Sequence, residues 1–168
     1  MQRCKVCCER YQGDSQTQKK DRVRQMIESN IIIRKAEPRD LGAIQELQIE
    51  TELLILGRPV DTEEFLQAIS GPPGFIGVAE VDGRVIGFIY GEKLVGNWVH
   101  APFFAITKDF RGTNVYRQLG QWFLDHCKAI GAKKILAYAD IDKPKLVNFY
   151  RRFGFVAGDT LVEMVKEI

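Results

Sequence analysis

The sequence lacks an excess of charge of either sign, a cysteine framework and any long apolar run. Its 168 residues contain 24 Lys and Arg against 22 Asp and Glu, a net charge of +2, whereas a nucleic-acid-binding protein usually shows a strongly basic face. The four cysteines are too sparse for a disulfide scaffold, and Cys127 has the spacing of a buried helix residue. No apolar stretch approaches the about 20 residues of a transmembrane helix. We therefore expect no nucleic-acid partner, no membrane insertion and a cytoplasmic location with reduced thiols.

The beginning of the sequence differs from the rest. It is polar and basic, with neither a sustained apolar period nor the apolar core of a signal peptide. We expect an extension over residues 1–29 and one domain over residues 30–168. Cys4, Cys7 and Cys8 lie in the extension, where Cys-x-x-Cys supplies only half of a zinc site. Because no second pair of Cys or His accompanies them, we predict no metal site.

From residue 31 onward, short apolar strands alternate with amphipathic helices. Asp82-Gly83 between two apolar runs is a strong signal for a β-hairpin. A strand, a helix and another strand in succession favour a parallel pair, here 99–107 with 134–139. The sequence therefore predicts a mixed α/β fold. The predicted strands are 31–33, 75–81, 84–92, 99–107, 134–139 and 161–165. One helix is predicted to begin at Pro38, and three others to cover 62–70, 114–130 and 142–153.

Pro102 interrupts the predicted strand 99–107. Proline has no N–H for the strand ladder and is confined to edge strands, strand starts and bulges. Because this strand is too apolar for a sheet edge, we predict a β-bulge, a feature that is common beside active sites. The bulge would release backbone N–H groups around residues 104–106 for other partners.

Three segments resemble the GNAT acetyltransferase superfamily, and the resemblance covers residues 31–168. Residues 103–112, FFAITKDFRG, are similar to the family's fourth strand and the start of its pyrophosphate loop. Residues 143–155, KPKLVNFYRRFGF, are similar to its last helix with the ending Tyr-x-x-x-Gly-Phe. Residues 33–40, IRKAEPRD, are similar to its opening. The Asp-Gly hairpin fits the same family.

The resemblance implies an α+β fold with a centrally splayed sheet of about six to seven strands, flanked by about four helices. It implies an N-acetyltransferase that passes an acetyl group from acetyl-CoA directly to a primary amine of a small molecule or protein. The cofactor would lie where the fourth and fifth strands part. Whether the chain forms a homodimer is left open by the resemblance. The strand residues implied to bind the cofactor are Phe104, Ala105, Ile106 and Thr107.

The resemblance assigns the pyrophosphate to the following loop and helix start, whose N–H groups and dipole suit an anion. Asn114 replaces the family's second glycine and tolerates left-handed backbone. Tyr116 replaces Gly or Ala, so its ring must point away from the phosphates or displace them. Without the resemblance, a plain loop with a helix cap explains the same residues. The implied cofactor-binding residues are Arg111, Gly112, Thr113, Asn114, Val115, Tyr116 and Arg117, together with Lys143, which stands in place of a family Asn and would reach a CoA phosphate.

Tyr150 and His100 are the candidate catalytic residues. The resemblance implies that Tyr150 donates a proton to the departing thiolate, and a phenol with a pKa of about 10 is protonated at neutral pH. Its helical spacing also fits a simple core stripe. His100 would deprotonate the amine through a water, and a structural histidine is the alternative. The reserve bases are Glu92, Tyr90 and Asp140.

The acceptor pocket is expected between the first two helices, their linker 57–59 and the strand through Tyr90 and Glu92. Arg58 would hold an acidic acceptor, and Glu50, Glu52 or Glu92 a basic one, although an ordinary surface role explains each.

Two other functions stay open. The first is a non-catalytic binding domain that has kept the fold and lost the cofactor, which Asn114 and Tyr116 motivate. The second is an interaction module that works through the N-terminal extension.

Overall fold

The computed structural model describes residues 30–53, 58–71, 73–139, 142–160 and 166. These residues fall into two compact units, one ending at Ala137 and the other beginning at Tyr138. The second unit contains α5 (Pro144–Arg152). The first unit contains the strands β1 (Ile32–Lys35), β2 (Gly74–Val81), β3 (Arg84–Leu94), β4 (Trp98–Ile106) and β5 (Lys134–Leu136), and the helices η1 (Pro38–Asp40), α2 (Leu41–Thr51), α3 (Thr62–Ser70), η2 (Lys108–Phe110) and α4 (Val115–Ala129).

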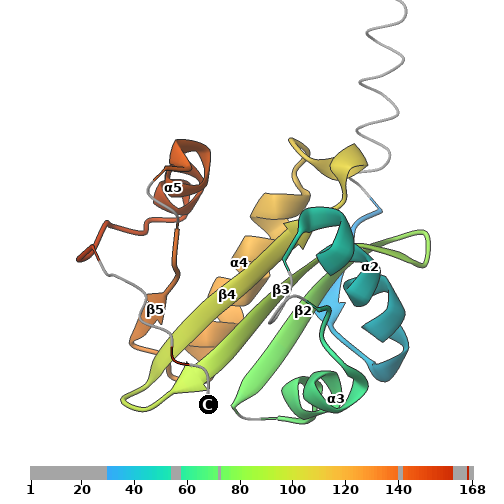
Figure 1. Cartoon of the computed structure of the whole chain (residues 1–168), viewed down its shortest axis with the longest axis horizontal. Helices are drawn as coiled ribbons and strands as arrows, with labels where there is room; N and C mark the ends of the chain where they lie inside the picture. The colour runs from blue at the N-terminus through green and yellow to red at the C-terminus, as the bar shows by residue number, and fades with distance from the viewer. Residues whose placement is uncertain (1–29, 54–57, 72, 140–141, 161–165, 167–168) are drawn as a thin grey trace, which may run out of the picture. The chain divides into compact units, whose positions relative to one another are not determined.

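The strands of the first unit form one sheet in the order β1-β2-β3-β4-β5 (Figure 1). β1 to β4 pair antiparallel, and β4 pairs with β5 in parallel, which confirms the predicted parallel step. The β2–β3 turn has φ of 51° at Asp82 and 79° at Gly83. Two successive positive φ angles are typical of the twisted two-residue turn that joins a hairpin, so the predicted hairpin is confirmed.

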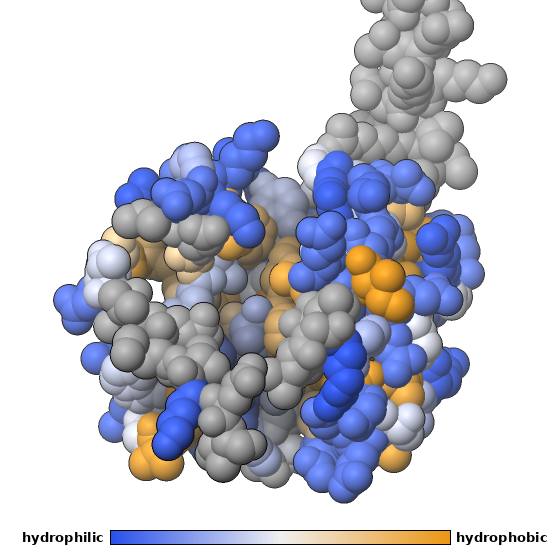
Figure 2. Space-filling model, in the orientation of Figure 1, coloured by the Kyte–Doolittle hydropathy of each residue, from blue (hydrophilic) through white to orange (hydrophobic). Residues whose placement is uncertain are grey.

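Helices cover both faces of this sheet. α2 and α3 lie on one face and α4 on the other (Figure 1). Alternation along β2 serves both layers, because Phe75 and Ala79 pack toward α4 while Ile76 and Val78 pack toward α2 and α3. Hydrophilic side chains cover most of the surface over α2 and α3 that Figure 2 shows. The apolar sides of both helices therefore turn to the sheet.

A buried ion cluster fixes the first strand and helix. The Arg34 guanidinium donates to both carboxylate oxygens of Asp40, at 2.7 and 2.8 Å, and to Glu80 Oε2 at 2.6 Å. The same Asp40 carboxylate accepts the N–H of Glu37 at 2.8 Å. β1, η1 and β2 are thus joined through one guanidinium, and Asp40 itself is only 3% exposed.

The predicted fold class is confirmed, although the strand count is lower than expected. The described residues contain a five-stranded sheet instead of six to seven strands, and the expected strand at 161–165 lies outside the described residues. β5 ends at Leu136 and does not reach residue 139. The helix expected from Pro38 begins with the short turn η1, and α3 has the predicted bounds.

Candidate active site

β3 and β4 pair irregularly near the middle of the sheet. Between the pairs Tyr90–Phe103 and Glu92–His100, β4 contains one residue more than β3. The extra residue falls at Ala101–Pro102, which confirms the predicted β-bulge. A bulge bends its strand and increases the local twist, so the direction of β4 changes here.

Gly91 faces the bulge, where two buried rings leave no room for a side chain. A Cβ atom on Gly91 would lie 2.4 Å from Cζ of Phe75 and 2.6 Å from Cε2 of Phe123. The two rings are 4% and 3% exposed and stack with centroids 5.4 Å apart. Glycine therefore lets the aromatic layer under α4 lie directly on the backbone behind the bulge.

β4 and β5 part at the bulge. Trp98–His100 pairs in register with Lys134–Leu136, where β5 ends, while β4 continues to Ile106. The two strands therefore share only a short paired segment. This geometry agrees with the splay between the fourth and fifth strands that the family resemblance implies.

The backbone groups of β4 beyond the bulge point alternately toward β3 and away from it. Thr107 donates its N–H to the carbonyl of Ile86 at 2.9 Å, which fixes the phase of the alternation. Ala105 has the same phase and also points to β3. Phe104 and Ile106 have the opposite phase and point to the side on which β5 has ended. Of the strand residues in the implied cofactor set, these two present their backbone to the splay.

Glu92 and His100 face each other across β3 and β4 at the last pair before the bulge. Residues directly opposite in an antiparallel pair have Cβ atoms about 4.5–5.5 Å apart. Burial lowers the pKa of His100, while the charge of Glu92 acts in the opposite direction. The imidazole is therefore mainly neutral at pH 7 and able to accept a proton. The third reserve base, Asp140, lies outside the described residues.

After β4, the chain turns through η2 into α4. Gly112 has a φ of 79°, in the left-handed region that favours glycine, and a Cβ there would meet no atom within 4 Å. Arg111 donates from Nε to the outward carbonyl of Ile106 at 3.1 Å, which anchors the loop to β4. Asn114 is the N-cap of α4 with φ −76° and ψ −4°. This right-handed conformation means that the tolerance of Asn for left-handed backbone is not used.

Tyr116, the bulkier departure from the family pattern, is partly buried. Its ring packs against the cluster that contains Val115 and Leu119. The guanidinium carbon of Arg117 lies 6.0 Å from the ring centroid, within the range of a cation–π contact. Because the ring is accommodated by the core, the packing does not require it to displace a phosphate from the loop.

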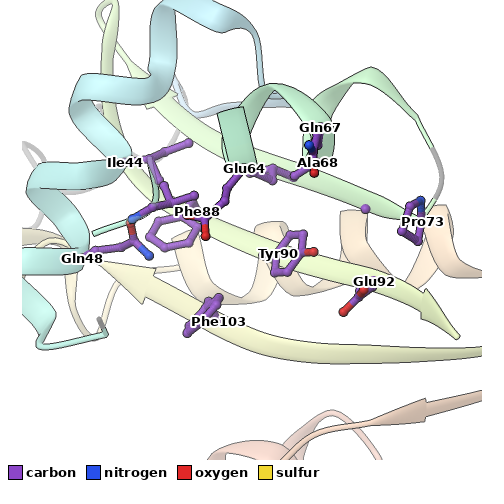
Figure 3. Close-up of a pocket in the computed structure, with 13 residues that line it drawn as sticks. Ile44, Gln48, Glu64, Gln67, Ala68, Pro73, Phe88, Tyr90, Glu92 and Phe103 are labelled. Atoms are coloured by element: carbon purple, nitrogen blue, oxygen red, sulfur yellow. The ribbon is translucent and has the colours of Figure 1, made fainter. Parts of the chain in front are cut away.

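A cavity of about 270 Å³ lies on the face of the sheet that α2 and α3 cover (Figure 3). Tyr90 and Glu92 project from β3, and Phe103 projects from β4. The rings of Tyr90 and Phe103 stack with centroids 6.1 Å apart. The cavity lies where we expected an acceptor pocket. Its lining residues are Ile44, Gln48, Val60, Glu64, Gln67, Ala68, Pro73, Gly74, Ile76, Phe88, Tyr90, Glu92 and Phe103.

Two glutamines of α2 hold the chain segment that leads into α3. Gln45 donates from Nε2 to the carbonyl of Val60 at 2.8 Å, and the N–H of Val60 donates to Oε1 of Gln48 at 3.0 Å. Gln48 is only 1% exposed. Both hydrogen-bonding groups of Val60 are thus satisfied by side chains, and this wall of the cavity is fixed. Sequence reasoning missed both glutamines, because their spacing does not distinguish them from surface residues.

Two other charged side chains considered for acceptor binding, Arg58 and Glu50, are engaged within the protein. Arg58 donates to both carboxylate oxygens of Glu64, each at 2.9 Å. Glu50 accepts the N–H of Lys108 at 2.9 Å and so ties α2 to η2, a contact that sequence reasoning also missed. Glu92 is the acceptor-binding candidate among them that lines the cavity.

In the second unit, Tyr150 belongs to the end of α5. The N–H of Phe155 donates to the Tyr150 carbonyl at 3.2 Å, and the N–H of Gly154 to the Arg151 carbonyl at 3.0 Å. With a φ of 82° at Gly154, this is a Schellman helix stop, and the Tyr150 and Phe155 rings, 5.3 Å apart, supply its apolar contact. Burial raises the pKa of Tyr150, so its phenol is protonated at neutral pH. Lys143 is the N-cap of α5.

The described part of the chain contains one cysteine, Cys127. Cys127 is 2% exposed, and burial raises the pKa of its thiol to about 12, so it is a core residue as predicted. Cys4, Cys7 and Cys8 lie outside the described residues. Among the described residues, no group of three or more His, Cys, Asp and Glu is arranged to hold a metal ion. No helix in this part of the chain has the length and apolar character needed to cross a bilayer.

The curated relatives that match this sequence are acetyltransferases. An uncharacterized N-acetyltransferase from Methanocaldococcus jannaschii is 36% identical over 85 residues, which is 51% of each chain. N-alpha-acetyltransferase 30 from Schizosaccharomyces pombe is 31% identical over 87 residues, 49% of this chain and 58% of the relative. The chain therefore spans about half the length of the curated relatives it matches.

Solved structures share the fold at low sequence identity. An aminoglycoside acetyltransferase from an uncultured soil metagenomic sample superposes with a TM-score of 0.71 at 13% identity, over 84% of this chain and 99% of the other. Ard1 from Thermoplasma volcanium superposes with a TM-score of 0.65 at 22% identity, over 77% of this chain and 85% of the other. The model of the acetyltransferase (GNAT) family matches residues 41–155. Together with the splayed strands, this match shows that the chain belongs to the GNAT acetyltransferase family.

Proposed function

We propose that the chain is an N-acetyltransferase that passes an acetyl group from acetyl-CoA to a primary amine in a ternary complex. The observation that carries this proposal is the position of Glu92 and His100, which face each other where β4 and β5 part. Glu92 also lines the adjoining cavity. The names of the curated relatives support an amine acceptor, on a small molecule or a protein. The cytoplasm is the compartment we predict.

The residues around the splay fit acetyl-CoA. The N-terminus of α4 and the open space beside Gly112 suit a pyrophosphate. The outward backbone groups of Phe104 and the outward N–H of Ile106 suit an extended amide-bearing arm, and Arg117 supplies positive charge for further phosphates. Lys143, in the second unit, is the other residue that we propose for a CoA phosphate. A structure of similar fold, an aminoglycoside N-acetyltransferase with a TM-score of 0.68, is in complex with CoA. When bound, acetyl-CoA supplies an acetyl group that is activated as a thioester.

The side chains divide the proton transfers between them. His100 takes a proton from the amine nitrogen, directly or through a water, and Glu92 stabilises the imidazolium that results. One outward N–H, that of Phe104 or that of Ile106, stabilises the negative charge that develops on the acyl oxygen, since N–H groups two residues apart on a strand lie about 6.5–7 Å apart and cannot both reach one oxygen. Tyr150 gives its proton to the leaving thiolate as the acyl group passes from sulfur to nitrogen. For an amine that binds in its neutral form, one proton is thus taken and one given for each amide that forms. An amine that binds as its ammonium ion releases one further proton to the solvent.

Thermal unfolding with and without acetyl-CoA tests cofactor binding. A ligand at about 100 times its Kd adds about 2.7 kcal/mol of stability, which raises Tm by about 5–11 °C for a chain of this size. Gly112→Val, which forces a β-branched residue into left-handed backbone at the loop, is the matched variant and reduces the rise. If neither acetyl-CoA nor longer acyl-CoAs raise Tm, the chain is a non-catalytic binding domain and the proposal fails.

The turnover of two Tyr→Phe variants tests the role of Tyr150 as the general acid. Tyr150→Phe removes only the hydroxyl, so we expect a lower kcat with the acetyl-CoA-induced rise in Tm retained. Tyr138→Phe makes the same change at a residue that is 58% exposed and leaves kcat unchanged. Equal turnover in wild type and Tyr150→Phe would remove Tyr150 from the mechanism.

A further inference from the structure

The cavity between α2, α3 and the sheet has a polar end at Tyr90 and Glu92, and most of its remaining wall is apolar. Phe88 and Phe103 line the sheet side, while Ile44, Val60 and Ala68 line the helical side (Figure 3). A body that fills this space meets aliphatic and aromatic carbon on most sides. Apolar surface that enters it is removed from water at a gain, whereas a charged group that enters it loses its hydration without a partner.

Two of the polar side chains that line the cavity are already engaged by the protein. Oε1 of Gln48 accepts the N–H of Val60. Both carboxylate oxygens of Glu64 are held by the guanidinium of Arg58, so the charge of Glu64 is compensated at the rim. Neither group is available to pair with a cation that enters the cavity.

Tyr90 and Glu92 remain at one end of the cavity, adjacent on the same face of β3. Among the ion pairs of the described residues, none includes Glu92. Burial raises the pKa of Tyr90, and the negative charge of Glu92 raises it further. Among the described residues, the cavity therefore offers one carboxylate without an ion pair, and it stands opposite His100, the proposed base.

The volume indicates how much of an acceptor lies inside the cavity. About 270 Å³ corresponds to roughly nine water molecules at about 30 Å³ each. The part of the acceptor next to the amine therefore occupies the cavity, and any further ammonium groups on that part would lie against apolar walls.

We propose that the acceptor is a primary amine carried by an otherwise uncharged, largely apolar body, with the amine held at Glu92 and His100 and the body against Phe88 and Phe103. This inference rests on the proposed function. A free alkylamine or arylalkylamine has this chemistry, and so has the N-terminus of a polypeptide whose first residue is apolar. A second ammonium lacks a carboxylate in the cavity, and an acidic body is repelled by Glu92.

Three amines that share a six-carbon chain separate charge from size. They are hexylamine, 1,6-diaminohexane and 6-aminohexanoate, whose far ends are neutral, cationic and anionic. Release of CoA thiol by the full chain measures kcat/KM for each at saturating acetyl-CoA. We expect hexylamine to exceed both others by at least about tenfold, since only hexylamine leaves no unpaired charge against the apolar wall. Equal or better use of the diamine or the amino acid overturns the inference.

A substitution in the cavity wall is expected to shift the preference from hexylamine toward the diamine. Gln67→Glu places a carboxylate on the α3 side of the cavity with almost no change of shape, so kcat/KM for 1,6-diaminohexane rises relative to hexylamine by at least about threefold. Gln121→Glu makes the same change on α4, at the opposite face of the sheet, and leaves the ratio as in wild type. An unchanged ratio in Gln67→Glu, with wild-type Tm, contradicts binding of the acceptor body in this cavity.

Two amidated tripeptides, Phe-Ala-Ala and Asp-Ala-Ala, distinguish polypeptide N-termini from small amines as the acceptor. Acetylation of the first at a rate similar to hexylamine, without the second, assigns the cavity to polypeptide N-termini. Acetylation of hexylamine alone assigns it to small amines. A rise in Tm with acetyl-CoA together with a preference for charged acceptors overturns this inference and leaves the proposed function intact. The absence of both a Tm rise and any CoA release overturns both.

Discussion

Replacing Gly91 with alanine adds one methyl group behind the bulge that carries the candidate base. The new Cβ would lie 2.4 Å from Phe75 and 2.6 Å from Phe123, a full ångström inside ordinary contact. Both rings are almost fully buried, so neither can move without disturbing the layer under α4. Overpacking of this kind costs about 1–3 kcal/mol, and two immobile rings place Gly91→Ala near 2–3 kcal/mol. Tm falls by about 4–12 °C.

Activity of Gly91→Ala falls as well, because the same backbone shift moves Glu92 against His100. Misplacement of reacting groups by about 1 Å costs up to about a hundredfold in rate, so we expect kcat/KM to drop by at least about tenfold. Urea unfolding followed by circular dichroism gives the stability change as a shift in midpoint at unchanged slope.

The control for this prediction is the same substitution in open space. A Cβ on Gly42, in α2, meets no atom within 4 Å, and alanine is preferred over glycine in a helix by up to about 1 kcal/mol. Gly42→Ala is therefore as stable as wild type or more stable. If Gly91→Ala unfolds within about 0.5 kcal/mol of wild type, the rings yield more easily than their burial implies and the reasoning is wrong.

Three further changes test other contacts. Glu92→Gln removes the charge that raises the pKa of His100, so the acidic limb of the kcat/KM profile shifts to lower pH; a limb that does not move contradicts His100 as the base. Glu50→Ala leaves the first N–H of η2 without its acceptor, and we expect a higher KM for acetyl-CoA at similar kcat in steady-state assays. Burial raises the pKa of Asp40, but hydrogen bonds from Arg34 and a backbone N–H outweigh it and leave the pKa below its usual range. We therefore expect the free energy of unfolding of Asp40→Asn to be about 3 kcal/mol lower than that of wild type at pH 7. The difference shrinks as the pH falls below about 4, where Asp40 becomes protonated. A difference in urea titrations that does not change with pH would contradict this assignment.

Features that depend on a few adjacent residues were predictable from the sequence. Pro102 indicated the bulge because a missing N–H is a property of one residue, wherever the partner strand lies. Asp82-Gly83 indicated the hairpin for a similar local reason. The order of strands and helices then predicted the parallel pairing of β4 with β5, although β5 proved shorter than its apolar run.

Contacts between distant residues were not predictable. Lys108 donates to Glu50 across 58 positions of sequence, and no local pattern indicates which of several surface glutamates is engaged. The need for glycine at position 91 depends on rings from β2 and α4 that meet only in the folded protein. The candidate pocket could thus be located from the sequence, while the charge preference that we propose for it could not, since that proposal depends on which carboxylates are already paired.

The helix stop at the end of α5 bears on how active members of this family are identified from genomes. The contacts described for that stop involve backbone groups of residues 150–155 or the edge-to-face contact of two rings, and none of them uses the phenolic hydroxyl. A lineage that exchanged the tyrosine for phenylalanine would keep the helix end, the glycine and the apolar contact, and its sequence would still score well against the signature. Glycine and phenylalanine at the last two positions therefore record how a helix terminates. If Tyr150 is the acid that we propose, the presence of its hydroxyl, and not the match to the signature, distinguishes the enzymes among such sequences.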